Sequence, residues 1–249
     1  MQSEKVDAVV YKGCPMILSS SASPNNFGTL EIEKGAYVEI RVSTKISIDV
    51  LKRPDGETLA KRPAEKAVGI IIDPKYDFYI KGADGQKGET GDDGDDGQGA
   101  GCGGLPGQPG GNGKAGGDGP TLTITVQELQ DDFTLVNVGG AGGRGGQGGD
   151  GGKGADNDDG DGGDGGDAGD GGNGGNGGDG GTLTLCYPTS GDFGITYEIK
   201  SAERGEGGRA GKPGNGGKGS PAGAVGKTGD PGSPGMRGKE GKITVKSLT

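Results

Sequence analysis

The sequence predicts an all-β base, a sandwich or barrel, that carries a six-arm polyglycine or polyproline II helical bundle. Glycine recurs at every third residue in three long segments, 82–119, 139–181 and 205–241. Polyproline II has three residues per turn and rises ~3.1 Å per residue, whereas helices repeat at 3.6 and strands at 2.0. Short β-branched stretches flank each segment, and a break near its middle divides it into two glycine runs. We therefore expect each segment to leave a β base, turn, and return.

The composition alone is typical of disorder, with 27% hydrophobic and 4% aromatic residues. The strict glycine period argues against disorder, because a disordered segment does not need glycine in register. A single arm has no internal backbone hydrogen bonds and would be a flexible coil. Order therefore requires the arms to lie side by side and bond to one another.

Residues 1–75 are predicted to form a small β-sandwich-like domain. Apolar residues alternate or run together in stretches rich in β-branched residues, and turn signals separate these stretches. The predicted strands, which we expect to be antiparallel, are 7–12, 29–34, 36–42, 45–51 and 67–73. Residues 61–66 are predicted to form one helical turn.

Residues 76–249 are predicted to be a second unit, a β base that carries the three out-and-back loops. Each glycine run begins or ends at a predicted strand, and a hairpin-like pair of strands separates consecutive loops. The predicted strands are 76–80, 121–126, 133–138, 182–187, 193–199 and 243–248. These strands tie the roots of the six arms together.

The type of triplet predicts where each arm lies. Residues 139–181 are mostly GGX, so two of the three faces of these arms are bare backbone that can approach a neighbour closely. Residues 82–97 and 223–241 are mostly GXX and have one bare face. We expect the middle loop inside the bundle and these two arms at its edge. The middle loop is acidic and 205–241 is basic, so we also expect the two loops to attract each other.

The segments YIKGADGQKG (79–88), GGNGKAGGDGPTLTITV (110–126) and GGAGGRGGQGG (139–149) carry a resemblance. Over 76–249 the chain resembles the glycine-rich N-terminal domain of Obg-type GTPases, which implies six polyproline II helices on a β base. No GTPase function is implied, because Gly226-Lys227-Thr228 has Pro221 where a phosphate-binding loop needs glycine.

The chain is also similar, more loosely, to bacteriophage tail-tip adhesins, and its run KGADGQKGETGDDG (81–94) is similar to collagen-like phage fibre proteins. A collagen triple helix would need three chains and abundant proline. The middle loop contains no proline, and each segment has a break in its glycine frame. An intramolecular bundle is therefore the preferred interpretation.

Carboxylates gather in the middle loop, where oxygen ligands could bind calcium. The calcium candidates are Asp156, Asp158 and Asp159 in its turn and Asp161 at the start of the returning arm, although the full calcium-loop pattern is missing. The returning arm has Asp or Asn at every third position, about 9 Å apart, and we expect a solvated, mutually repulsive face there.

We predict no catalytic residue and no cofactor. The chain has no histidine, which excludes histidine-dependent catalysis, and its carboxylates lie on glycine arms without an apolar wall to raise a pKa. Cys14, Cys102 and Cys186 have no metal-site or disulfide spacing.

The net charge of −10 disfavours a nucleic-acid partner. No stretch is apolar enough to span a membrane, and residues 1–13 lack a signal-peptide core. Self-association, or binding to other fibre or virion subunits, is the expected partnership, at an extracellular surface or on a virion.

Three functions fit these observations. The first is a non-enzymatic structural subunit of a fibre or surface assembly, since exposed sheet edges favour self-association. The second is a receptor-binding adhesin that uses the turns at the arm ends. The third is an ice-binding protein, which would need a flat face of small uncharged side chains.

Overall fold

The computed structural model describes residues 5–20, 25–60 and 75–248, and these contain eleven strands and one short helix. The first elements are β1 (Val6–Val10), β2 (Met16–Leu18), β3 (Asn26–Ile32), β4 (Val38–Ile40), β5 (Thr44–Lys52) and the helix α1 (Gly56–Ala60). The later strands are β6 (Phe78–Lys81), β7 (Leu122–Leu129), β8 (Phe133–Val138), β9 (Thr182–Tyr187), β10 (Ile195–Lys200) and β11 (Lys242–Ser247).

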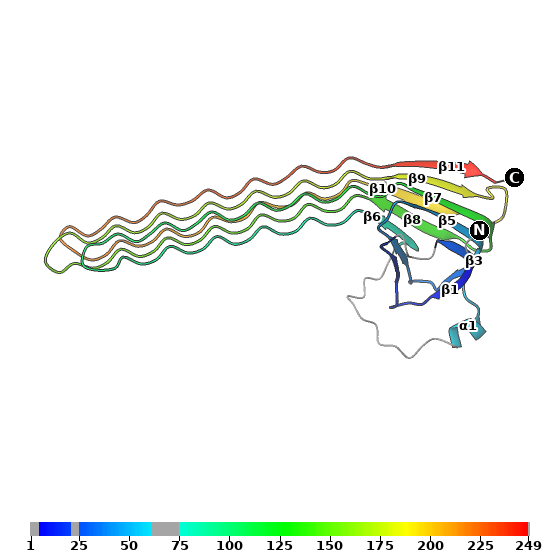
Figure 1. The fold of residues 1–249 in the computed structure, drawn as a ribbon, viewed down its shortest axis with the longest axis horizontal. Coiled ribbons are helices and arrows are strands. Elements are labelled where there is room, and N and C mark those ends of the chain that lie inside the picture. The colour runs from blue at the N-terminus through cyan, green and yellow to red at the C-terminus, as the bar shows by residue number, and fades with distance from the viewer. Residues whose placement is uncertain (1–4, 21–24, 61–74, 249) are drawn as a thin grey trace.

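Successive strands alternate between two sheets. The odd-numbered strands form one sheet in the order β1-β3-β5-β7-β9-β11, and the even-numbered strands form the other in the order β10-β8-β6-β4-β2. All nine strand pairs of the described chain are parallel. The chain thus winds as a flattened coil in which each turn adds one strand to each sheet (Figure 1). We call this part the coil.

The predicted fold class, an all-β sandwich or barrel of antiparallel strands with a helical bundle, is wrong. The structure has two parallel sheets and, in the described residues, one five-residue helix. The hairpin-like pairs of the prediction are not paired: β7 and β8 lie in different sheets, as do β9 and β10. Alternating apolar residues report that one face of a strand is buried, but they do not report the direction of the neighbouring strand.

Most predicted strands correspond to observed ones. The three-residue strand β2 was missed, since MIL is too short to show an alternation. The predicted strand 67–73 and the predicted helical turn 61–66 lie outside the described residues. Both sheets cross the predicted boundary at residue 75 without interruption, because β4 pairs with β6 and β5 pairs with β7.

The hydrophobic core lies between the two sheets. Alternate residues of each strand face inward, and the inward side chains of the central turns are fully buried, including Ile48, Ile80 and Leu135. Phe78 and Phe133 of the even sheet pack edge to face, with ring centroids 6.4 Å apart. This core holds the roots of the glycine segments in fixed register.

An ion pair links the turns on the side of the coil that lies opposite the glycine segments. The Arg53 guanidinium bonds both carboxylate oxygens of Asp77, at 2.6 and 3.1 Å, and lies 4.2 Å from the ring centroid of Phe133. Asp77 is only 6% exposed and also accepts the backbone N–H of Thr134 at 2.8 Å. Because a buried carboxylate is costly without a partner, Arg53 is a structural residue.

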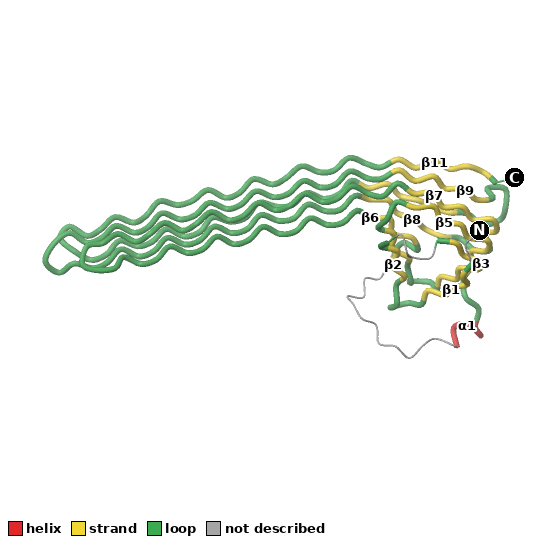
Figure 2. The backbone as a smooth tube through the Cα atoms, in the orientation of Figure 1, coloured by secondary structure: helices red, strands yellow, loops and turns green. Residues whose placement is uncertain are grey.

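The three glycine segments are the last three connections from the even sheet to the odd sheet. Figure 2 shows them running side by side, away from the coil, as one long rod. We number the arms 1 (82–97), 2 (101–119), 3 (139–154), 4 (160–181), 5 (205–217) and 6 (223–241). Arms 1, 3 and 5 leave β6, β8 and β10, and arms 2, 4 and 6 return into β7, β9 and β11.

Candidate functional site

Backbone hydrogen bonds join the arms at every third residue. In arm 3, the Gly145 N–H donates to the carbonyl of Glu206 in arm 5 at 2.9 Å, and the Gly146 N–H donates to that of Gly111 in arm 2 at 2.8 Å. The carbonyl of Gly146 accepts from the Gly172 N–H of arm 4 at 2.9 Å, and other carbonyls of arm 3 accept from arm 1. Arm 3 is therefore bonded to four neighbours.

The number of neighbours follows the type of triplet. Arm 4 is bonded to arms 2, 3, 5 and 6, whereas arm 1 is bonded only to arms 2 and 3, and arm 6 only to arms 4 and 5. The prediction that the middle loop lies inside, with 82–97 and 223–241 at the edges, is confirmed by these bonds. An arm needs two faces without side chains to accommodate four neighbours at hydrogen-bonding distance.

Close approach explains why glycine is needed. A Cβ at Gly146 would lie 1.7 Å from the carbonyl oxygen of Glu89, and one at Gly208 would lie 1.7 Å from the carbonyl oxygen of Gly146. Neither position has room for any side chain. The bonded arms therefore exclude a side chain at the positions where two backbones approach this closely.

Asp and Asn side chains add a second set of bonds, which the sequence reasoning missed. Along arm 4 these side chains accept a backbone N–H from arm 6, at 2.7 Å for Asp167 to Lys227 and 2.8 Å for Asn173 to Ser233. The full set in arm 4 is Asp164, Asp167, Asp170, Asn173, Asn176 and Asp179, all at 2.7–2.9 Å. We call this set the Asx ladder.

The expectation of a merely solvated, repulsive face is therefore wrong for these residues. Five of the six are exposed, but each binds an N–H that the glycine bonds leave unused. Shorter ladders join other arms, for example from Asp93 of arm 1 to the N–H of Asp150 and from Asp150 to that of Lys212. The spacing of Asp and Asn at every third residue was the available signal.

The predicted charge attraction between the middle loop and 205–241 has a minor part. A direct contact is Lys239 Nζ to Asp179 Oδ2 at 4.0 Å, and Lys239 is largely exposed. The Asp179 carboxylate instead accepts the backbone N–H of Lys239 at 2.9 Å. Acidic residues thus bind the facing arm mainly through its backbone N–H groups. The positive side chains of that arm make a second, smaller contribution to the attraction.

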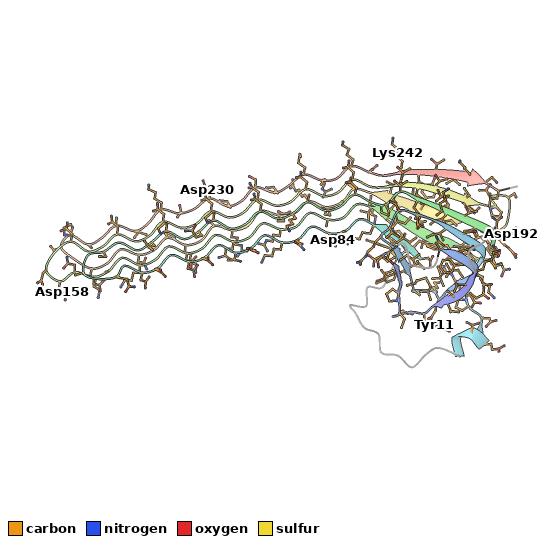
Figure 3. The ribbon with its side chains drawn as sticks, viewed as in Figure 1. Tyr11, Asp84, Asp158, Asp192, Asp230 and Lys242 are labelled. Atoms are coloured by element: carbon orange, nitrogen blue, oxygen red, sulfur yellow. The ribbon has the colours of Figure 1, made fainter. Side chains whose placement is uncertain are left out.

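The calcium candidates lie in the turn at the far end of the rod, where Figure 3 places Asp158. Asp156 Oδ1 accepts the backbone N–H of Lys218 at 2.8 Å, and this bond, aided by Lys153, lowers the pKa of the Asp156 carboxyl. The carbonyl of Asp161 accepts from Asn157. In the described residues no three acidic, Cys or His side chains lie close enough to hold a metal ion.

The turns at the rod end are bonded to one another. The Asn157 N–H donates to the carbonyl of Lys218, and the Ser220 N–H donates to that of Gly160, at 2.8 and 2.9 Å. Ala155 donates to the carbonyl of Cys102 at 2.9 Å. The turns 155–159 and 218–222 are therefore bonded to each other, and the first loop, which turns at 98–100, is bonded to them through Cys102. Together the ends of the three loops form one distal tip.

The C-terminal end of the coil leaves its core partly open. Ile195 and Tyr197 of β10 face between the sheets, as do Ile243 and Val245 of β11, because they pair with the inward residues of β8 and β9. Tyr197 is nevertheless 43% exposed, and Ile243 and Val245 are only half-buried. No further turn of the described coil covers them.

The N-terminal end differs. The inward side chains Val10 of β1 and Leu18 of β2 are 1% and 2% exposed. Figure 1 shows α1 beyond β1 at this end, and the hydroxyl of Tyr11 donates to the carbonyl of Thr58 in α1 at 3.4 Å. The two ends thus differ in degree, because Val6 of β1, which pairs with the inward residue Phe27, is 43% exposed and Ala8 and Met16 are half-buried.

A cleft lies on the turn side of the coil, opposite the rod. Its lining is Glu33, Lys34, Arg53, Pro54, Asp131, Asp132 and Phe193. The Arg53 guanidinium already bonds Asp77 and the carbonyls of Ile32 and Asp132. Arg53 is therefore not free to bind an anion, and the other cation of the cleft is Lys34.

Comparisons with known proteins provide little further information about this chain. No protein-family model matches the chain, and no curated protein matches it. A solved structure, the nine polyproline type II helical bundle springtail antifreeze protein from Granisotoma rainieri, is 26% identical over 67% of this chain and 96% of that chain. Its TM-score is 0.12, so the two structures do not superpose. The described residues contain no helix with the length and apolar character to cross a membrane.

Proposed function

We propose that this chain is a non-enzymatic structural subunit of an extracellular or virion assembly, in which the coil makes the attachments and the rod is a stiff extension. The observation that supports this proposal is the continuous bonding of the rod. Each of the six arms is tied to at least two others by bonds that recur at every third residue. At ~3.1 Å per residue the longer arms reach roughly 60 Å from the coil.

Stiffness follows from how these bonds are shared. An arm of the rod bends only if bonds to its neighbours stretch, and each neighbour is bonded in turn to other arms. One backbone bond contributes ~0.5–1.5 kcal/mol, so bending is opposed by many small terms at once. A rod of this kind suits a spacer better than a site for chemistry.

Electron microscopy of the purified chain over a range of concentrations tests the proposal. We expect ordered polymers or layers of a single chain type, with rods at regular spacing. A variant with a disrupted rod, Gly175→Ala, should lose the regular projections. Isolated particles at every concentration would refute the proposal.

A second candidate function is receptor binding through the distal tip. The observation that favours it is the bonding of the three turns into one surface at the end of the rod. A chain that stays isolated but binds whole cells or glycans, and loses this binding when 155–159 is replaced by glycine and serine, would favour the adhesin. Thermal hysteresis in cold solution would instead favour ice binding.

A further inference from the structure

We propose that two copies of this chain join through the C-terminal ends of their coils, with β11 of each copy pairing antiparallel with β10 of the other. The inference rests on the proposed structural role, because a subunit must offer a contact to another chain. It adds the surface, the partner and the symmetry of that contact.

The edges of both sheets at this end have unused backbone groups. Lys242 and Leu248 donate toward β9, to the carbonyls of Gly181 and Tyr187. Groups alternate between the two sides of a parallel strand, so the N–H and C=O of Ile243 and Val245 face away from β9. The Gly194 carbonyl accepts from β8, which by the same alternation leaves the odd-numbered residues of β10 facing outward.

The register of arms 5 and 6 fixes how these edges would meet. The Gly235 N–H donates to the carbonyl of Gly205 at 3.0 Å, and the Gly238 N–H donates to that of Ala202 at 3.2 Å. Extending this antiparallel register into the coil places Lys242 level with Glu198. A two-fold axis parallel to the strands keeps residues at the same level, so it carries this register into the contact between copies.

The resulting cross-strand pairs are matched in chemistry. With the residue of the second copy given second, they are Lys242 with Glu198, Ile243 with Tyr197, Thr244 with Thr196, and Val245 with Ile195. The apolar pairs face the inside of the joined coil and the charged pair faces outward, which is the arrangement that stabilises neighbouring strands. The pairs of odd-numbered residues are also those whose free N–H and C=O groups face each other.

The contact covers the side chains that the coil leaves open. Tyr197, 43% exposed in the single chain, would lie against Ile243 of the other copy. A head-to-tail contact would instead use the N-terminal end, where Val10 and Leu18 are already covered and Val6 is the exposed inward side chain. Two identical open ends related by a two-fold axis form a closed pair.

Light scattering on the purified chain tests the pairing. At concentrations below those at which larger order forms, we expect a mass of two chains, and a mass of one chain for Tyr197→Lys, because a lysine at the centre of the contact would be buried without a partner. Val225→Lys is the matched control: Val225 is 61% exposed on arm 6, and its substitution should leave the pair intact. Amide exchange of the rod should be the same in both variants, which shows that each is folded.

Cysteine cross-linking tests the register. In a chain with its three native cysteines replaced by serine, Thr196→Cys and Thr244→Cys are made separately. Their Cα atoms would be about 4.5 Å apart across the contact, which is within disulfide range. We expect a cross-linked pair only when the two variants are mixed, and none from either variant alone.

A chain of single mass, or a pair that survives Tyr197→Lys and does not cross-link in the mixture, would overturn the inference. Polymers that form despite Tyr197→Lys would overturn it while leaving the proposed function in place. A cross-linked pair that never forms larger order would support the pairing and contradict the proposed assembly.

Discussion

Adding a single methyl group inside the rod should separate its arms. A Cβ at Gly175 would lie 2.0 Å from the carbonyl oxygen of Lys114 in arm 2, whereas Cβ contacts below 3.0 Å are essentially never seen. In Gly175→Ala the two arms must therefore move apart by about 1 Å. The inter-arm bonds beside this contact are Gly113 to Asn173 and Gly116 to Asn176, both 2.8 Å. Stretched to about 3.8 Å, they would no longer be hydrogen bonds.

The size of the effect follows from these bonds. The Lys114 carbonyl also accepts from Gly143 at 2.8 Å, so three bonds are disturbed. At ~1 kcal/mol each, Gly175→Ala should destabilise the rod by about 3 kcal/mol.

A matched control lies in arm 2. A Cβ at Gly117 would have its nearest neighbour at 3.5 Å, the backbone of Ala83. Gly117→Ala should be neutral or stabilise by up to ~1 kcal/mol, because alanine restricts the unfolded chain.

Amide hydrogen exchange of residues 104–119 and 160–181, with thermal unfolding followed by circular dichroism, measures the two effects. We expect faster exchange along both segments in Gly175→Ala and unchanged or slower exchange in Gly117→Ala. Equal effects of the two substitutions would refute the packing argument, and so would exchange that is already unprotected in the native chain.

Three further predictions concern side chains. Asp167→Ala should make the arm 6 amide that it binds exchange about fivefold faster, as expected for a bond of ~1 kcal/mol, whereas Asp167→Asn should leave that amide unchanged. Arg53→Met should lower the free energy of unfolding in urea by about 3–5 kcal/mol, because it leaves the buried carboxylate of Asp77 without its cation. The pKa of Glu198 is lowered from 4.5 to about 2, chiefly by the ammonium of Lys75; its contribution to stability should be complete above pH 4.5 and lost as pH falls toward 2. Lys75→Ala should raise that pKa toward its ordinary value in a carboxyl NMR titration, and an unchanged titration would contradict the assignment.

The positions of the arms could be predicted from the sequence, because glycine is needed where backbones approach most closely and its period marks these contacts. Strand ends were predicted within a few residues, as in β11, predicted at 243–248 and observed at Lys242–Ser247. Strand direction could not be predicted. In a coil, strands that follow each other in the chain lie in different sheets, so hydrogen-bonded partners are a full turn apart in sequence. No local pattern records which distant segment supplies the partner.

The Asx ladders also join segments that are far apart in the sequence, but here the constant separation between bonded residues reveals which segments pair. Every ladder bond from arm 4 to arm 6 joins residues 60 apart, and the ladder bonds from arms 1, 2 and 3 join residues 57, 61 and 62 apart. Each separation is the length of one turn of the coil, arms included, and within each pair of arms it is constant along the printed ladder. The length of one loop must therefore match the length of the next loop. Three residues added to each arm of a single loop would leave the N–H and C=O groups at its end without neighbours, whereas the same addition to all three loops would lengthen the rod and keep every bond. This mutual constraint, which is absent from any one segment, is what gives three glycine-rich loops a common end.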